Sequence, residues 1–550
     1  RAAAGRARTA VASRRGRGGL QAPRCWRRLA VCCAALVAAA LAAKMPASAS
    51  SDVAVVWFRK CLRLHDNAAL VEASKKAKRV CPVFVIDPHF GPAYVGVNRY
   101  RFLLESLKDL DEQLKKKYNS RLIVLRGKPE QVFAELFKSG KPLMKGAPQT
   151  ILWEQDTEPY AKKRDIAIAK LAKAHCVDVE TFVGHTLFDP DQALTKNKGK
   201  APSTMQGITT LLKSLGEVPE PLAPPTKLPP PPEGAGKFPV PTLKEMGYAE
   251  PADKVVFAGG ETAGLARMAA KLKDTAYICN FQKPKTKSTD FNPPSTTVLS
   301  PYLKFGCVSV RRFYHGLKKA VAGKKHSEPP GSLLGQIYFR EMAYLQGLSV
   351  ANFDQQEGNP ACKQIPWDTN PALLKAWREG KTGYPFIDAV MRQLVQVGWM
   401  HHLARHAVAC FLTRGDLWIS WVEGAKVFDK YLLDADWAIN NHNWLALSGA
   451  APWSPPFFRV YHPVPKMDSS LNVQDPEGKF VREFVPELKK MPAKYIYAPW
   501  TAPLDVQKAA GCVIGKDYPR PVVEHEVASK DNIARFKQAL SAGKRAAPSG

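Results

Sequence analysis

Two histidines four residues apart carry the most suggestive chemistry in this sequence. In the run GWMHHLARH (398–406), helical spacing would place His402 and His406 on one face of a helix, while His401 points elsewhere. Such a pair can donate and accept protons near neutral pH. It could also ligate a metal, but no third ligand or HExxH-type glutamate accompanies it, so we expect no metal. The alternative is that both histidines are core residues whose hydrogen bonds serve only the structure.

A second stretch combines carboxylates, amides and indoles. In DLWISWVEGAKVFDKYLLDADWAINNHNWLALSG (416–449), Asp434, Asp436 and Asn440 lie just beyond a predicted helix, where they could bind a polar ligand. Three tryptophans bracket these polar residues: Trp418, Trp421 and Trp444. Spacing alone would assign the tryptophans to core packing.

A third stretch, PSTTVLSPYLKFGCVS (294–309), places small hydroxyl residues before a helix that is predicted to start at Ser300-Pro301. Hydroxyls and free backbone N–H groups at a helix start can hold a phosphate. Ordinary helix capping explains the same residues.

The elements that must position these residues fall into two halves. Five short apolar runs alternate with amphipathic stretches such as 99–118, which predicts a parallel sheet with helices on both faces. The predicted strands are 52–58, 79–87, 121–127, 150–156 and 178–184. No GxGxxG or Walker-type loop follows any of them.

The second half is predicted to be helical, and a proline-rich segment separates the halves. We expect an α/β domain at 52–190, a semi-rigid linker at 191–260 whose proline-rich part, 200–250, holds neither helix nor sheet, a helical domain at 261–525 and a short flexible tail at 526–550.

The net charge of +31 favours a polyanionic partner. Residues 1–51 contribute nine Arg, one Lys and no acid, which leaves 70 basic and 49 acidic residues, or +21, for the remainder. A soluble basic surface is the alternative. The eleven cysteines show no CxxC pair or metal-ligand spacing, which indicates reduced thiols in an intracellular compartment.

The first 51 residues are considered separately. An Arg-rich flank leads into LAVCCAALVAAALAA (29–43), which is short for a membrane span and typical of a removable targeting segment. The first Met is Met45, and the alternative interpretation is that residues 1–44 are upstream sequence that the working protein lacks.

Taken together, these stretches resemble the photolyase/cryptochrome family from about Asp52 to about residue 525. The opening VVWFRKCLRLHDNAAL (55–70) is similar to the family's first strand and loop, and AWREGKTGYPFIDAVMRQL with DADWAINNHNW is similar to its flavin-binding core. The resemblance implies an N-terminal α/β antenna domain (a Rossmann-like parallel sheet), a long linker and an all-α FAD-binding domain.

The resemblance also implies roles for individual residues. Asn440 matches the residue that faces flavin N5, and Arg405 is expected to pair with Asp434. The implied FAD-binding positions are Thr296, Thr297, Val298, Leu299, Ser300, Gln336, Arg340, Trp399, His402, Arg405, Asp434, Asp436 and Asn440. The implied electron-transfer chain from the surface to the flavin is Trp444, Trp421 and Trp367, with Trp418 as a fourth member.

His402 indicates the branch, because cyclobutane-dimer photolyases have Asn there, whereas HHLARH resembles the 6-4 photolyases and animal-type cryptochromes. We therefore expect blue-light repair of 6-4 photoproducts in DNA by electron transfer from reduced FAD. His402 is assigned as proton donor and His406 as its partner. Lys283, Gln336 and Tyr461 are expected to contact the lesion or DNA, and the lesion must be flipped out of the duplex to reach them.

Some residues depart from the family pattern. Phe339 and Ala446 stand where a Trp is usual or frequent, and 449–463 is atypical, although Trp453 could substitute as a stacking platform. Losing a platform worth about 1–3 kcal/mol would weaken damage binding. This keeps a second interpretation open, an animal-type cryptochrome acting as a light receptor or transcription regulator. The short tail favours repair over that alternative, and a colourless protein without flavin is the outside possibility.

Three further expectations complete the interpretation. The antenna pigment is a deazaflavin, a folate or absent. The protein is a monomer without a membrane segment in its mature form. DNA repair implies the nucleus, whereas residues 1–44, if genuine, would direct the chain to a plastid or another organelle.

Overall fold

Five parallel strands form one sheet in the N-terminal part of the chain. The computed structural model describes residues 51–234, 238–250, 256–454, 459–467 and 469–546, so the predicted targeting segment lies outside the described residues. The strand order is β3-β2-β1-β4-β5, and each strand overlaps one predicted run. The strands are β1 (Ser51–Phe58), β2 (Ala77–Ile86), β3 (Ile123–Arg126), β4 (Thr150–Glu154) and β5 (Asp178–Phe182).

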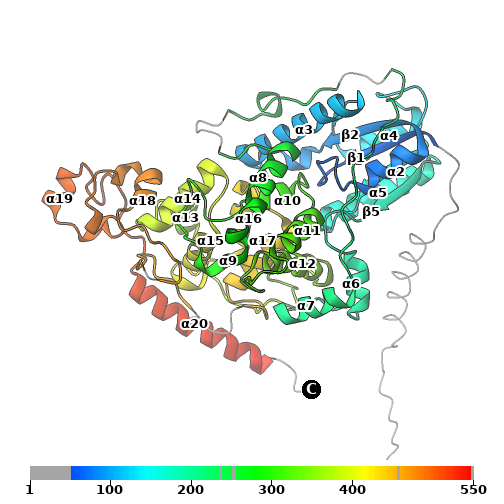
Figure 1. Cartoon of the computed structure of the whole chain (residues 1–550). Coiled ribbons are helices and arrows are strands. Elements are labelled where there is room, and N and C mark those ends of the chain that lie inside the picture. Colours follow the sequence, from blue (N-terminus) through cyan, green and yellow to red (C-terminus); the bar gives the residue numbers. More distant parts are fainter. Residues whose placement is uncertain (1–50, 235–237, 251–255, 455–458, 468, 547–550) are drawn as a thin grey trace, which may run out of the picture. The chain divides into compact units, whose positions relative to one another are not determined.

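Helices cover both faces of this sheet (Figure 1). Because successive side chains of a strand point to opposite faces, Val55 and Trp57 pack with α4 and α5, while Val56 and Phe58 share a core with α2 and α3. The predicted α/β class is confirmed. The covering helices are α2 (Ala68–Lys76), α3 (Val97–Tyr118), α4 (Pro129–Ser139) and α5 (Pro159–Ala174).

The proline-rich range 200–250, predicted without helix or sheet, contains helix α7 (Met205–Ser214), and this part of the prediction was wrong. A further helix, α6 (Pro190–Lys196), precedes it. The run MQGITTLLKS lies before the dense prolines, so nothing in it interrupts helical hydrogen bonding. The Thr204 side chain accepts a hydrogen bond from the backbone N–H of Gly207 and caps α7.

The rest of the described chain is helical, apart from isolated bridges. A π-helix, η4 (Phe411–Gly415), follows α15 directly, and short 3-10 turns lie at 88–90, 244–246, 283–285, 486–488, 493–495 and 499–501. The helices are α8 (Glu261–Lys273), α9 (Thr275–Asn280), α10 (Ser300–Lys304), α11 (Val310–Val321), α12 (Leu333–Ser349), α13 (Pro371–Arg378), α14 (Pro385–Val397), α15 (His402–Cys410), α16 (Trp421–Tyr431), α17 (Trp437–Leu447), α18 (Lys479–Phe484), α19 (Leu504–Ala509) and α20 (His525–Ala546).

Buried polar contacts join the sheet domain to the helical part. Arg311 on α11 donates two hydrogen bonds to the buried carboxylate of Asp66, and Asn98 on α3 donates to the carbonyl of Gln396. Breaking one partner of a buried ion pair typically costs about 3–5 kcal/mol. The Arg311–Asp66 ion pair therefore stabilises the packing of the sheet domain against the helical part.

The expected flexible tail is instead largely helix α20, shown in red in Figure 1. It is ordered because Phe536 is 4% exposed and packs with Ile365 and Trp418, while α20 also contacts η4. No helix in the described part of the chain has the length and apolar character needed to cross a bilayer.

Candidate active site

A cavity of about 690 Å³ opens within the helical part and collects most of the predicted site residues. A volume of this size is within the range of small-molecule and cofactor pockets. The predicted residues that line it are Lys283, Thr296, Thr297, Val298, Leu299, Ser300, Gln336, Arg340, Trp399, His402, Arg405, His406 and Asp434. Asp436, Asn440, Tyr461 and the four proposed electron-transfer tryptophans do not line it.

The histidine pair lies on the cavity wall as one unit. His402 begins α15, and its Nε2 is 2.9 Å from Nε2 of His406 one turn later, so one imidazole donates to the other. Nδ1 of His406 is 3.4 Å from the hydroxyl of Tyr461, which places Tyr461 behind the pair. His401 caps α15 instead, accepting from the N–H of Leu403. Among the described residues, the group of three potential metal ligands is His462, His525 and Glu526, which lines neither cavity.

Burial keeps both imidazoles neutral. It lowers the pKa of His406 to about 4, with the nearby cations Lys283 and Arg414 adding to the effect. The pKa of His402 is held well below its usual value by burial, by Lys283 and by His406. The two rings therefore share one hydrogen-bonding proton at neutral pH, and an anion in the cavity would favour adding a second.

Asp434 is the acceptor in the opposite part of the wall. One carboxylate oxygen, Oδ2, accepts from Nη2 of Arg405 at 2.9 Å and from the hydroxyl of Ser300 at 2.6 Å, as the predicted Arg405 pairing requires. The other oxygen, Oδ1, is buried and has no hydrogen-bond partner among the described residues. A buried unpaired carboxylate oxygen is costly, so this atom fits a ligand that carries an N–H donor.

The segment from Thr296 to Ser300 runs along the cavity into α10. Val298 has a φ of +50°, a left-handed conformation that a β-branched residue rarely adopts. Such backbone strain persists where the surroundings hold it, and it occurs frequently at ligand-binding segments. The hydroxyl of Ser300 is already donated to Asp434, so the threonines and the backbone are the groups left for a phosphate.

Asp436 and Asn440 have structural contacts in this conformation. Asp436 caps α17 and accepts from the hydroxyl of Tyr344 at 2.9 Å, while the amide of Asn440 donates to the carbonyl of Ala425 at 3.0 Å. Burial alone would raise the pKa of Asp436, but its hydrogen bond with His185 and the cation of Lys60 hold it well below its usual range. The assignment of Asn440 to flavin N5 stays a prediction.

The sequence reasoning missed other residues of α17. Ile439 and Asn443 line the cavity beside Ala446, at the spacing of one helical face, a signal that was available in the sequence. Trp453 also lines it, with its ring stacked on His442 at 5.5 Å between centroids. Trp453 therefore supplies an aromatic surface in the same cavity wall as Ala446, as the substitution argument suggested.

The proposed electron-transfer tryptophans lie behind the cavity. Trp444 on α17 and Trp421 at the start of α16 are buried, and the two helices pack together. Trp367 is half-buried, with its ring centroid 4.9 Å from that of Trp418. Trp377, which the sequence reasoning did not single out, also contacts Trp444 at 6.2 Å. Their redox role stays a prediction.

Gly424 makes close packing around Trp444 possible. A Cβ at this position would lie 2.2 Å from Cη2 of Trp444 and 2.7 Å from Cδ2 of Leu412. We therefore expect Gly424→Ala to destabilise the protein by about 1–3 kcal/mol, the usual cost of overpacking. Urea unfolding would measure this loss of stability. Gly323→Ala is the comparison: its Cβ would meet no atom within 4 Å, but its φ is +69°, so it shows the cost of backbone strain alone. Equal losses in the two variants would contradict the packing argument.

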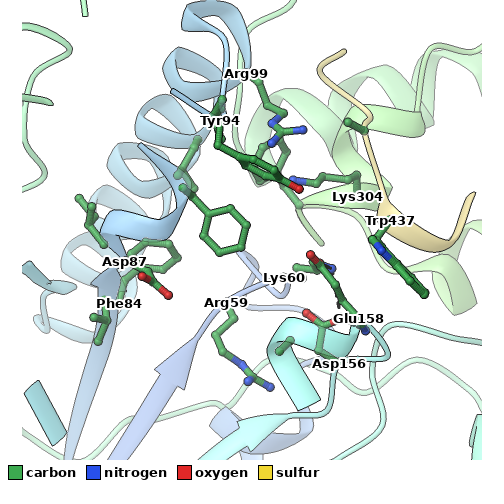
Figure 2. A pocket seen from close by; sticks show the side chains of 18 of the residues that line it. Arg59, Lys60, Phe84, Asp87, Tyr94, Arg99, Asp156, Glu158, Lys304 and Trp437 are labelled. Atoms are coloured by element: carbon green, nitrogen blue, oxygen red, sulfur yellow. Dashed lines mark hydrogen bonds and ion pairs between the residues drawn. The ribbon is translucent and has the colours of Figure 1, made fainter. Parts of the chain in front are cut away.

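A second cavity lies at the carboxyl ends of the strands (Figure 2). Lys60, just after β1, donates to Asp156 at 3.1 Å and to Glu158 at 2.8 Å, both just after β4. Burial lowers the pKa of Lys304 on the facing wall to about 7, with Arg99 adding to the shift. The carboxyl ends of parallel strands are a usual place for ligands. The cavity is about 130 Å³ and carries charges of both signs.

Comparison with known proteins identifies the class. Residues 54–229 match a family profile described as DNA photolyase, and residues 333–538 match the FAD binding domain of DNA photolyase. Among solved structures, a class III photolyase from Agrobacterium tumefaciens superposes with a TM-score of 0.76 and 29% identity, covering 91% of this chain and 100% of that one. A cryptochrome from Synechocystis gives 0.75 and 27%, covering 88% and 98%.

The full-length relatives make the family certain. The chain is 47% identical to a (6-4)DNA photolyase from Oryza sativa subsp. japonica over 89% of this chain and 90% of that protein. It is also 47% identical to cryptochrome-1 from Gallus gallus, over 88% and 78%. The chain belongs to the photolyase/cryptochrome family. FAD is its cofactor, and the matched domain extends to residue 538, so it includes much of α20, beyond the limit near 525 that the sequence suggested.

Proposed function

We propose that this protein repairs 6-4 photoproducts in DNA under blue light. The observation that supports the proposal most is the His402–His406 pair, hydrogen-bonded at 2.9 Å on the wall of the cavity that most of the predicted FAD-binding residues line. The similarity to (6-4)DNA photolyases from two plants, at 47% and 46% identity, is consistent with it.

Bound FAD supplies light absorption and one-electron transfer in this cavity, with Asp434, Arg405, Arg340 and the 296–300 segment holding it. The protein's own residues do the remaining work. A damaged base flipped out of the duplex meets Trp453, whose ring offers a stacking surface. Gln336 and Lys283 lie on the same wall to contact the lesion and its phosphates.

Proton delivery falls to the histidine pair. Moving a hydroxyl or amine back between two pyrimidines requires a proton at the transferred group as well as an electron. Burial holds both imidazoles neutral in the free protein. The negative charge of bound DNA raises their pKa, because it stabilises the protonated form of the pair. His402 then donates a ring proton to the transferred group, and His406, which is hydrogen-bonded to it through Nε2, stabilises the ring that has lost its proton.

Lys283 should make lesion binding depend on pH. Burial, assisted by Arg405, lowers the pKa of Lys283 to about 8, so its ammonium is lost as pH rises through that value. We expect affinity for a lesion-bearing oligonucleotide to fall by up to about tenfold between pH 7 and 9. Lys283→Arg, which keeps its charge over this range, should flatten the profile; identical profiles for the two proteins in fluorescence anisotropy would contradict this role.

The alternative is a light receptor or transcription regulator with little repair activity. The equal similarity to cryptochrome-1 and the presence of Ala446 and Phe339 on the cavity wall favour keeping it. Repair and reception need the same cofactor, so the two differ in what the cavity does with damaged DNA.

The second cavity is the place we propose for an antenna pigment, a deazaflavin or a folate. We further propose that the protein acts as a monomer in the nucleus, or in a plastid or another organelle if residues 1–44 direct it there.

Binding in the dark separates the two functions before any light is applied. A repair enzyme should bind an oligonucleotide with one 6-4 lesion at least about 100-fold more tightly than the undamaged duplex. Trp453→Ala should reduce that ratio about tenfold through the lost stacking surface. Equal affinity for damaged and undamaged duplex would favour the receptor.

A further inference from the structure

Helix α20 covers Trp418, one of the two outer tryptophans. Trp418 is 1% exposed and lies between Trp367, at 4.9 Å between ring centroids, and Phe536 of α20, at 6.3 Å. Trp418, Phe536 and Ile365 form a small core of their own, and Trp367 packs against both this core and the main one. Trp367, by contrast, is only half-buried. Of the two rings, the one without access to solvent is therefore Trp418.

An exposed salt bridge lies over the buried ring. The Arg535 guanidinium carbon lies 4.6 Å from the ring centroid of Trp418, and its two terminal nitrogens donate to both carboxylate oxygens of Asp368 at 2.8 and 2.5 Å. The hydrogen bond from Arg535 lowers the pKa of Asp368, so the carboxylate is charged at neutral pH. The Asp368 N–H in turn donates to the carbonyl of Trp418 at 2.9 Å.

Trp418 is held firmly and has no base beside it. Its φ is +53°, which bulky residues rarely adopt, and its indole N–H donates to the carbonyl of Pro366 at 2.8 Å. The indole of Trp367 donates to the side-chain carbonyl of Gln356 at 2.8 Å. Neither amide oxygen is basic enough to take a proton, so an electron removed from either ring leaves a positive charge there. Such a charge responds to the ions around it.

We propose that Arg535 and Asp368 decide which outer tryptophan carries the electron vacancy after flavin photoreduction. The cation over Trp418 disfavours a second positive charge on that ring, so the vacancy settles on Trp367, which solvent reaches. The inference rests on the proposed tryptophan chain and adds two positioning residues to it.

The electrons balance in four transfers. Trp444 gives one electron to the photoexcited oxidised flavin, Trp421 refills Trp444, and the outer pair refills Trp421. A thiol in solution then gives one electron to Trp367 and its proton to water, which restores the neutral ring.

Opposite single substitutions test the inference. Removing the cation in Arg535→Gln should leave the vacancy on buried Trp418 and slow its refilling by added dithiothreitol about tenfold, a factor typical of one partly screened charge at this distance. Removing the anion in Asp368→Asn should move it further toward Trp367 and keep refilling at least as fast as in the unmodified protein. The double variant should return near the starting rate. Transient absorption of the tryptophan radical gives the rates, and pulsed electron paramagnetic resonance gives the separation of the radical from the flavin.

The design excludes a merely structural role, because both single variants break the same ion pair. If α20 only shielded Trp418 from solvent, both single variants would shift the refilling rate in the same direction. That result, or no shift in either variant, would overturn this inference and leave the proposed repair function untouched. Arg126→Gln, which breaks the exposed 2.9 Å pair with Glu245 in the α/β part, should change nothing. A protein with no tryptophan radical would overturn the photoreduction chain, and the inference with it.

Discussion

Replacing His402 with alanine is expected to abolish 6-4 repair, with a loss of at least about 100-fold, while flavin photoreduction continues at its normal rate. The reason is the position of His402 on the cavity wall, in a 2.9 Å hydrogen bond to the only other imidazole on its face of α15. The tryptophans lie elsewhere, behind the cavity, so electron supply does not depend on this ring. Lesion conversion measured by chromatography, alongside flavin absorbance under light, would separate the two effects.

The matched variant His402→Asn keeps a polar side chain of similar size but cannot act as an acid near neutral pH. It should lose repair to the same extent and bind the lesion oligonucleotide nearly as well as the unmodified protein. Burial lowers the pKa of His406 to about 4, so the protonated form of the pair becomes scarcer as pH rises. The repair rate should therefore fall as pH rises. Repair that survives in either variant would refute the proton-donor role.

Replacing Trp421 with phenylalanine should slow flavin photoreduction by at least about tenfold and leave repair unchanged once FAD has been reduced chemically. Trp421 is fully buried, and Phe is smaller than Trp, so Phe fits the space that the indole fills. Phenylalanine is far harder to oxidise than tryptophan, so the vacancy cannot pass outward.

Trp153→Phe is the control for this experiment. Trp153 is also buried, but it packs against Trp57 in the α/β domain, 5.7 Å between ring centroids. It should leave photoreduction unchanged. Equal slowing in both variants, or none with Trp421→Phe, would mean that electrons reach the flavin by another route.

The sequence predicted the sheet well because strands that are buried on both faces are written as short, continuous apolar runs. Val55 and Trp57 face one side and Val56 and Phe58 the other, and turns flank the run. The linker and the tail were predicted poorly because their average composition hides the short segments that form helices. The proline-free run of α7 and the apolar contact of Phe536 with Trp418 are each a few residues long.

The candidate site was predicted in composition more than in geometry. Motif resemblance places Asp434, Arg405 and the histidine pair in one cavity, and the structure brings them together. Motif resemblance alone does not show how the segment 434–437 lies between the two cavities. In the structure, Asp434 faces the large cavity, while Ala435 and Trp437 line the second one. Which side chain of α17 faces inward depends on helix rotation, which favours Asn443 over Asn440 here.

Light-driven conversion of defined lesions tests the central claim most directly. Two oligonucleotides, one with a single 6-4 photoproduct and one with a cyclobutane dimer, are incubated with the protein carrying reduced FAD, in blue light and in the dark, and the products are separated by chromatography. We predict conversion of the 6-4 lesion to normal pyrimidines in light alone, with the cyclobutane dimer untouched. An unconverted 6-4 lesion in a protein that holds reduced FAD and binds the oligonucleotide would contradict the account.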